Sequence, residues 1–358
     1  NKLANEGVRA KWMIPSFPTK TFPNHYAIAT GLYPEHNGIV ENSIYDFGVI
    51  FTIDDKKRVS ESRWWLGEPI WVTAEKQGEH SAAYFFPGTE AEIEGTRPEF
   101  WKTYDGKIPD NDRVDTVLGW LDEPVEKRPQ MILMYFSDTD DAGHAHSPDS
   151  EEVRSAISRE DGAVARLISG LAARGIDKQV NVIIVSDHGM AAVDRRRAIL
   201  MDTYFDPRLT EKYLLTGEIL QIFPRAGQEV SIIEGLRSVQ HATCWRRSDI
   251  PARLHYNEGK RIAPIVCSAD EGWTMTTRDR YQAEKKRDDF LRPHGAHGYD
   301  NKYQSMMATF IANGPAFKSG YVAKPFENIQ VYNVMCKILG LKPANTDGNI
   351  DVVKGMLK

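Results

Sequence analysis

Three short apolar runs stand out along the chain and predict buried strands. They are "QMILMYF" (130–136), "VNVIIVS" (180–186) and "SMMATFIA" (305–312), and each stops at polar or glycine-containing residues. Unbroken rather than alternating apolar residues are typical of strands that are covered on both faces, as in parallel sheets. We therefore expect all three runs to be parallel strands at the centre of the fold.

The segment between the first two runs has the periodicity of an amphipathic helix. Its apolar positions recur every three or four residues, at Val153, Ile157, Val164, Leu167, Ile168 and Leu171. Gly175 is placed to end this helix, and Gly340 is placed to end a second helix expected near 328–339. Strand, helix, strand is the unit of a parallel sheet covered by helices. The pattern predicts an α/β fold with a mostly parallel central sheet flanked by helices.

Two stretches, 41–110 and 205–295, depart from this pattern. They are rich in turns, prolines and tryptophans and lack a clear periodicity. We expect them to be irregular, cap-like insertions that contribute to a substrate pocket. No internal repeat or low-complexity linker divides the chain, so residues 1–358 are interpreted as a single domain with 205–295 as a candidate inserted cap region.

Charge and composition narrow the range of ligands. The 358 residues include 45 Lys and Arg against 50 Asp and Glu, a net charge of −5. The basic clusters Arg195–Arg197 and Lys285–Arg287 each lie beside acidic residues, which favours a solvated surface. The sequence therefore predicts no groove for a nucleic-acid polymer and leaves small anionic substrates open. No segment approaches the roughly 18 consecutive apolar residues of a membrane helix, and the oligomeric state is not indicated.

Three cysteines are too few for a fold that depends on disulfides, and they lack zinc-finger spacing. Cys244 and Cys267 could pair in an oxidising compartment, which would leave Cys336 as a buried thiol in an apolar helix. Three unpaired thiols are the alternative.

Side chains suited to metal binding gather at the ends of the predicted strands, where ligands bind in open parallel sheets. They occur in "SDTDDAGHAH" after the first run, in "SDHGM" after the second and in "HGAHGYD" before the third. The candidates are Asp138, Asp140, Asp141, His144, His146, Asp187, His188, His294 and His297. Carboxylates and imidazoles without thiolates suit a catalytic zinc or a similar transition metal. One Asp–His pair is more often structural, but the clusters together predict a two-metal site.

The stretch "SFPTKTFPNHY", Ser16 to Tyr26, places a threonine at the expected start of a helix. If Thr21 caps the helix that Pro23 starts, its hydroxyl can point at the metals, while the helix N-terminus favours an anion. Metal coordination makes a threonine hydroxyl a competent nucleophile, and this arrangement suits attack on phosphorus. The alternative is that Thr21 is an ordinary helix cap.

These segments resemble the nucleotide pyrophosphatase/phosphodiesterase family of the alkaline phosphatase superfamily. The resemblance rests on "PSFPTKTFPNHYAIATGLYPEHNGIVENSIYD", "DAGH", "VIIVSDHGM" and "GAHGYD", which follow the family's order. The intervening "PGTEAEIEGTRPEFWKTYDG" and "DEGW" are similar as well, so the likeness covers nearly the whole chain. It is closest in kind to compact bacterial members without extra modules, and it implies an alkaline phosphatase-like fold.

The resemblance implies a role for each matching residue. Thr21 would be the nucleophile that transiently carries the nucleotidyl group, and Asn42 would donate to a non-bridging phosphate oxygen. One zinc would be held by Asp140, His144 and His297, and the other by Asp187, His188 and the Thr21 oxygen. The nucleobase would stack between Phe22 and Tyr104, for which ordinary packing is the alternative. The remaining candidates match no ligand of the family and are interpreted as supporting or surface groups: Asp138, Asp141, His146 and His294.

The resemblance departs from the family at one point. The family's pattern begins with an apolar strand that ends in a metal-binding aspartate, and Asn1 lies downstream of the position where that strand would fall. We expect the strand to be omitted from this sequence rather than lost from the protein, because every other motif is intact.

The function implied is zinc-dependent hydrolysis of nucleotide phosphodiester and pyrophosphate bonds, which releases nucleoside 5'-monophosphates. The family's habit suggests a periplasmic or secreted protein. One alternative is hydrolysis of a lipid or choline-type phosphodiester or of a phosphonate, with an aromatic cage drawn from Trp64, Trp65, Trp71 and Trp101. The other is a homologue that binds metal and nucleotide without catalysis.

Overall fold

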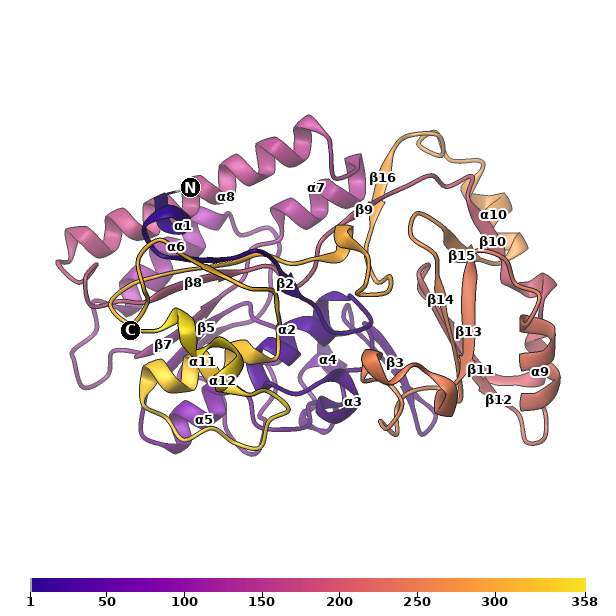
Figure 1. Cartoon of the computed structure of the whole chain (residues 1–358), viewed down its shortest axis with the longest axis horizontal. Coiled ribbons are helices and arrows are strands. Elements are labelled where there is room, and N and C mark those ends of the chain that lie inside the picture. The colour runs from indigo at the N-terminus through magenta and orange to yellow at the C-terminus, as the bar shows by residue number, and fades with distance from the viewer. Residues whose placement is uncertain (1) are drawn as a thin grey trace.

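The computed structural model describes residues 2–358 and has an α/β architecture with strands between two layers of helices (Figure 1). Helices α6 (Asp110–Trp120) and α8 (Glu151–Ala173) lie on one side of the strands. Helices α2 (Thr21–Thr30), α5 (Ile70–Lys76) and α11 (Gln330–Leu339) lie on the other. The predicted fold class is confirmed.

The first apolar run forms β7 (Met131–Met134) in a three-stranded parallel sheet. Its order is β6 (Phe100–Lys102), β5 (Ser81–Tyr84), β7. Side chains alternate between the two helical layers, so that Ile132 packs with α6 and α8, while Met131 and Leu133 pack in the cluster formed with α2, α5 and α11. This double coverage explains why the run is apolar without interruption.

The second and third runs form β8 (Val182–Val185) and β17 (Phe310–Asn313) in a mixed four-stranded sheet. Its order is β18 (Tyr321–Ala323), β1 (Val8–Ala10), β17, β8. Strand β17 runs antiparallel to both β1 and β8, so the prediction that the third run is parallel is wrong. The chain leaves β8 and returns to β17 at the same edge, where Gly189 N–H donates to the Met306 carbonyl at 3.0 Å. Because the chain enters β17 at the end where it leaves β8, β17 runs in the opposite direction to β8.

Strands β7 and β8 are not hydrogen-bonded to each other, but both pack against the helical layer of α6 and α8. Within residues 2–358, β7 pairs only with β5 and β8 only with β17, so each presents one edge without a strand partner. Ile132, Met134 and Phe136 from the first strand region and Val182 from the second pack against the same apolar cluster under α6 and α8. Side-chain packing, not main-chain hydrogen bonding, joins the two sheets here.

Both predicted helices are present. Helix α8 begins after Ser150, whose side chain accepts a hydrogen bond from Val153 N–H, and the chain turns at Gly175 with φ +67°. Ile157, one of the apolar positions expected to face the core, is 54% exposed. Ala156 and Ala163 are buried on the inner face of α8. Helix α11 ends at Gly340, which adopts the left-handed conformation.

The stretch 205–295, expected to be irregular, contains a regular antiparallel sheet that lies to one side of the helical layers (Figure 1). The order is β11 (Thr210–Leu215), β12 (Ile219–Pro224), β14 (Ile265–Ala269), β13 (Ala242–Arg246), with α9 (Glu229–Leu236) beside it. A disulfide joins Cys244 to Cys267 across β13 and β14, and Cys336 is a buried free thiol. Strand β14 is buried along its whole length and β12 over its first four residues, so neither shows the alternation of a strand with one exposed face.

The remaining elements are short and connect these layers. They are α1 (Lys2–Glu6), β2 (Met13–Ile14), α3 (Pro34–Asn37), β3 (Ser43–Asp46), β4 (Val49–Thr52), α4 (Lys56–Val59), α7 (Asp138–His146), β9 (Ala191–Val193), β10 (Ala198–Leu200), β15 (Thr274–Thr276), α10 (Arg278–Glu284), β16 (His294–Ala296), β19 (Phe326–Glu327) and α12 (Ile350–Val353). Among the described residues, no helix is both long enough and apolar enough to cross a membrane.

We predict opposite effects for two glycine substitutions. A Cβ at Gly189 would lie 2.0 Å from the Ser305 carbonyl oxygen, so Gly189→Ala must displace the main chain beside β17 and should lower the free energy of unfolding by about 1–3 kcal/mol. Gly162 lies in α8, and a Cβ there would meet no other atom. Gly162→Ala should therefore raise the free energy of unfolding by about 0.5–1 kcal/mol. Urea unfolding of both variants measures this. A Gly189→Ala protein as stable as the parent would contradict the close approach of the two loops.

Candidate active site

Four segments far apart in the sequence meet beyond the ends of the strands. Strand β7 leads into α7, where Asp140 and His144 lie one turn apart on the same face. Strand β8 leads directly to Asp187 and His188, and β16 leads to His297. The fourth segment is the start of α2 at Thr21. The structure therefore gathers these six of the selected residues into one region.

Asp140, His144 and His297 form the first group, in which one ligand atom from each side chain lies within 4.8 Å of the others. The Nε2 atom of His144 is 3.1 Å from the Nε2 atom of His297. The Asp140 carboxylate lies 3.5 Å from the first of these nitrogens and 3.7 Å from the second. The three side chains converge on a common point.

Hydrogen bonds on the far side of each imidazole fix which nitrogen carries the proton. His144 Nδ1 donates to the Gly295 carbonyl at 2.9 Å, and His297 Nδ1 donates to the Thr19 carbonyl at 2.8 Å. The Nε2 atoms of the two rings therefore face each other beside the Asp140 carboxylate. Burial, and then the nearby charges of His188 and Lys20, lower the pKa of His297 well below its usual range, which keeps the ring neutral.

Asp187, His188 and Thr21 form the second group. His188 Nδ1 lies 2.8 Å from the Gly189 carbonyl oxygen, and its Nε2 atom lies 3.0 Å from Asp187 Oδ2 and 3.5 Å from Thr21 Oγ1. The His188 ring stacks on the His297 ring with centroids 3.5 Å apart, so the two groups are contiguous. Burial raises the pKa of Asp187, but the charges of His188 and His25 outweigh it and hold that pKa well below its usual range.

The donor set fits metal ions. Asp140 Oδ1 is buried without a hydrogen-bond partner, and burial raises the pKa of Asp140. Asp187 Oδ2 is also buried and faces the imidazole nitrogens of His188 and His25 at 3.0 and 3.3 Å. Buried carboxylate oxygens and facing imidazole lone pairs repel one another unless a cation lies between them. Mixed nitrogen and oxygen ligands of this kind are typical of catalytic zinc and related metals.

Thr21 does not cap α2, and the prediction that it does is wrong. The helix begins at Thr21 itself, and the capping position belongs to Lys20, whose side chain makes no capping hydrogen bond. The hydroxyl of Thr21 is directed toward His188 instead. Since the helix does not use this oxygen, it remains available for chemistry.

Asn42 takes over part of the capping role. Its Oδ1 atom accepts a hydrogen bond of 3.0 Å from the main-chain N–H of Phe22, an amide in the first turn of α2. This bond fixes the orientation of the side-chain amide and leaves the Nδ2 donors without a hydrogen-bond partner in residues 2–358. The Asn42 side chain is thus anchored to the residue that follows Thr21.

Phe22 and Tyr104 belong to separate aromatic groups. Phe22 lies 5.8 Å from Trp65 and 6.2 Å from Phe51, measured between ring centroids. Tyr104 lies 5.3 Å from Phe85, and its side chain is 39% exposed. Among the described aromatic pairs, none joins Phe22 to Tyr104, so the structure does not bring these two rings into contact.

The remaining candidates have other partners. Asp138 accepts a hydrogen bond of 2.8 Å from Arg159 at the surface, and His146 lies 3.9 Å from Glu152. His294 is buried, with Nδ1 3.3 Å from the main-chain oxygen of His144. Asp141 lines a cavity beside them.

The sequence analysis missed two buried residues next to Thr21. His25 Nδ1 lies 2.9 Å from the Thr21 carbonyl and 3.3 Å from Asp187 Oδ2. Lys20 pairs with Glu218 at 2.5 Å and so links this loop to the sheet of the 205–295 stretch. Their only signal in the sequence is that charged and polar residues occur within "TKTFPNH", a segment that turns out to be almost fully buried.

Known proteins resemble this chain in sequence and in structure. The sequence profile described as "Type I phosphodiesterase / nucleotide pyrophosphatase" matches residues 1–300. The chain is 38% identical to venom phosphodiesterase CdcPDE from Crotalus durissus collilineatus, over 100% of this chain and 43% of the venom protein. It is 36% identical to mouse ectonucleotide pyrophosphatase/phosphodiesterase family member 1, over 100% of this chain and 40% of the mouse protein. The chain therefore spans less than half the length of these curated relatives, which are vertebrate proteins.

The solved structures include murine ectonucleotide pyrophosphatase/phosphodiesterase 5 as an inactive threonine-to-alanine variant in complex with AMP. It superimposes with a TM-score of 0.91 at 30% sequence identity, over 100% of this chain and 93% of that one. Profile, sequence and structure point the same way. The chain belongs to the type I phosphodiesterase/nucleotide pyrophosphatase family, and through it to the alkaline phosphatase superfamily.

Proposed function

We propose that this protein is a zinc-dependent hydrolase that cleaves nucleotide phosphodiester and pyrophosphate bonds and releases nucleoside 5'-monophosphates. The observation that carries the proposal is the position of the Thr21 hydroxyl, which does not cap its helix and lies 3.5 Å from the Nε2 atom of His188. A threonine placed in this way beside metal-type ligands suits nucleophilic attack on phosphorus.

Two zinc ions would be held by the chain's own donors. Asp140, His144 and His297 would hold one, and Asp187, His188 and the Thr21 oxygen the other. When bound, zinc supplies Lewis-acid charge that lowers the pKa of a hydroxyl or water and stabilises a leaving oxygen.

The reaction would proceed in two displacements at phosphorus. Thr21 Oγ1 gives up its proton to solvent and forms a bond to phosphorus as the bond to the leaving group breaks, and the leaving oxygen takes the electron pair. The product is a nucleotidyl ester of Thr21. A water molecule then forms a new bond to phosphorus, the bond to Oγ1 breaks, and the hydroxyl of Thr21 is restored with a nucleoside 5'-monophosphate as product.

Asn42 would stabilise the transition state as a neutral donor. Its oxygen is held by the Phe22 amide at 3.0 Å, so its Nδ2 donors are orientated before substrate arrives, and they suit a non-bridging oxygen whose charge grows during attack. A neutral amide favours a singly charged phosphodiester over a dianionic monoester, which arginine would grip more tightly.

The base of a nucleotide would lie against exposed aromatic surface next to Thr21. The murine relative in complex with AMP supports a nucleotide as the ligand. We propose that Phe22 and Tyr104 contact the base from two sides, which is a sequence-tolerant mode of binding.

A choline-type cage has less support. Trp64, Trp65 and Trp71 are all buried in the core, with exposed fractions of 0%, 3% and 0%, so they offer no open aromatic walls to a quaternary ammonium group. Of the four tryptophans considered for such a cage, only Trp101 has partial exposure.

We also propose an oxidising compartment, either the periplasm or the cell exterior. The disulfide between Cys244 and Cys267 supports this, as do the relatives named as venom and ecto-enzymes. The 205–295 stretch would act as a cap region within a single catalytic domain, tied to the nucleophile loop by the buried pair of Lys20 and Glu218.

Metal content tests the cofactor. The parent protein should bind two zinc ions, and a chelator should abolish turnover until zinc is restored. His297→Ala should lose at least one zinc, because it removes a nearly buried ligand shared with Asp140 and His144. His146→Ala is the control. This exposed histidine lies on α7 with Asp140 and His144 but outside the ligand group, so its loss should leave the zinc content at two. Equal zinc loss in both variants, measured by mass spectrometry of the metal, would refute the assignment.

Paired substrates test the nucleophile and the phosphate donor. Thr21→Ala should reduce kcat for the nitrophenyl ester of thymidine monophosphate by roughly four orders of magnitude or more, and Thr21→Ser should retain part of it. Asn42→Ala should reduce kcat by roughly 10²–10³. The parent should prefer this diester to nitrophenyl phosphate. Full turnover by Thr21→Ala, or a preference for the monoester, would be incompatible with the proposed function.

A further inference from the structure

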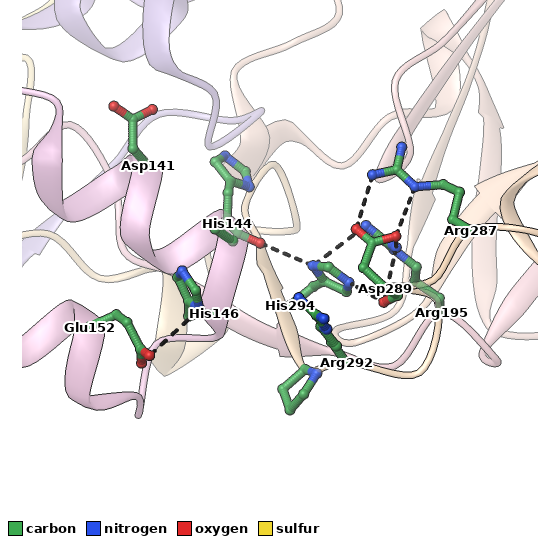
Figure 2. A pocket seen from close by; sticks show the side chains of 11 residues that line it. Asp141, His144, His146, Glu152, Arg195, Arg287, Asp289, Arg292 and His294 are labelled. Carbon is green, nitrogen blue, oxygen red and sulfur yellow. Dashed lines mark hydrogen bonds and ion pairs between the residues drawn. The ribbon is translucent and has the colours of Figure 1, made fainter.

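A cavity of about 650 Å³ opens beside the metal-type ligands (Figure 2). One wall is formed by α7 and the start of α8, and the other by the segment before His294 together with Arg195. The lining residues that matter here are His144, Asp141, Arg195, Arg287, Asp289 and Arg292. The sequence analysis had assigned the two basic clusters that supply Arg195 and Arg287 to solvated surface, but the fold brings these residues together across about 90 residues of chain.

The cavity lies on the His144 side of the site. The His144 side chain, which is 45% exposed, belongs both to the first ligand group and to the cavity wall. Thr21 lies on the other side, against His188. In a displacement at phosphorus the leaving group departs opposite the attacking oxygen. A leaving group that departs away from Thr21 therefore moves past His144 toward this cavity.

One wall of the cavity carries excess positive charge. Asp289 accepts hydrogen bonds of 2.9 Å from Arg287 Nε and Nη2, and it lies 3.1 Å from Arg195 Nη1. One carboxylate thus neutralises only one of two guanidinium groups. Arg292 adds a further charge and has no ion-pair partner within residues 2–358. The acidic residues of the cavity, Asp141 and Glu152, belong to the opposite wall on α7 and α8.

Arg195, Arg287 and Arg292 form what we call the arginine wall, which keeps N–H donors that are not used in contacts with Asp289. The contact with Asp289 fixes the planes of Arg195 and Arg287, as Figure 2 shows. Arg287 uses Nε and Nη2 for this contact and keeps its Nη1 donors, and Arg292 keeps all of its donors. Guanidinium groups with free N–H donors bind phosphate oxygens in a two-pronged manner.

We propose that this arginine wall binds the terminal phosphates of a nucleoside triphosphate as the leaving pyrophosphate. It would favour substrates with a charged, phosphate-bearing leaving group over esters with an uncharged one. This inference rests on the proposed function and adds to it a binding site for the part of the substrate that is not the nucleotidyl group. Asn42 recognises the phosphate under attack, whereas Arg287 and Arg292 recognise the phosphates beyond it.

The test compares two substrates of the intact enzyme. Arg292→Ala should lower kcat/KM for ATP about tenfold, the loss expected for one charged hydrogen bond, and Arg287→Ala should do the same or more. Both should leave kcat/KM for the nitrophenyl ester of thymidine monophosphate within about twofold, because its aryl leaving group has no phosphate for arginine to bind. Arg237→Ala, an exposed arginine at the end of α9, is the matched control and should leave both values unchanged.

Product inhibition gives a second measurement. The inhibition constant of magnesium-saturated pyrophosphate should rise about tenfold in Arg292→Ala, and that of AMP should stay the same. Parallel losses for both substrates, or no loss for ATP, would overturn the arginine-wall proposal while leaving the proposed function standing. If the parent turns over neither substrate, the proposed function fails, and calorimetric titration of pyrophosphate into parent and Arg292→Ala still decides the arginine wall, since equal affinities would overturn it.

Discussion

The site depends on one electrostatic conflict, the approach of two imidazoles and a carboxylate around a common point. His144 and His297 each commit Nδ1 to a main-chain carbonyl, so their Nε2 atoms face each other at 3.1 Å beside a buried Asp140 oxygen without a hydrogen-bond partner. Protein interiors rarely leave such groups unsatisfied, because burial without a partner costs free energy. A cation relieves the conflict. The same carbonyl contacts that create it also hold the ligands in place before the metal arrives.

The fold brings these ligands together because the chain returns several times to the same end of the sheets. Strand β8 ends at Val185, just before Asp187. The chain then departs through the 205–295 stretch and comes back through His297 to β17 at the same end of the sheet. Lys20, next to Thr21, pairs with Glu218 of the departing stretch, and burial of this pair ties the nucleophile loop to the inserted sheet. The excursion is therefore part of the site's architecture, although it contributes neither Thr21 nor its nearest ligands.

The sequence was informative where chemistry and local pattern coincide, and less so where long-range geometry decides. Unbroken apolar runs identified β7, β8 and β17, but a strand covered on both faces has the same pattern in either direction, so the antiparallel course of β17 could not be predicted. Threonine before a proline resembles a cap, yet α2 starts one residue earlier than a cap would require. The arginine wall was hidden because Arg195 and Arg287 each have an acidic neighbour in sequence, whereas in space they share one carboxylate.

The most direct test of this account is an anomalous diffraction map of crystals of the zinc-loaded protein, recorded on both sides of the zinc absorption edge. The account predicts two zinc peaks, one bounded by Asp140, His144 and His297 and the other by Asp187, His188 and the Thr21 hydroxyl. An active protein with no zinc peak among these side chains, or with zinc bound only elsewhere, would contradict it.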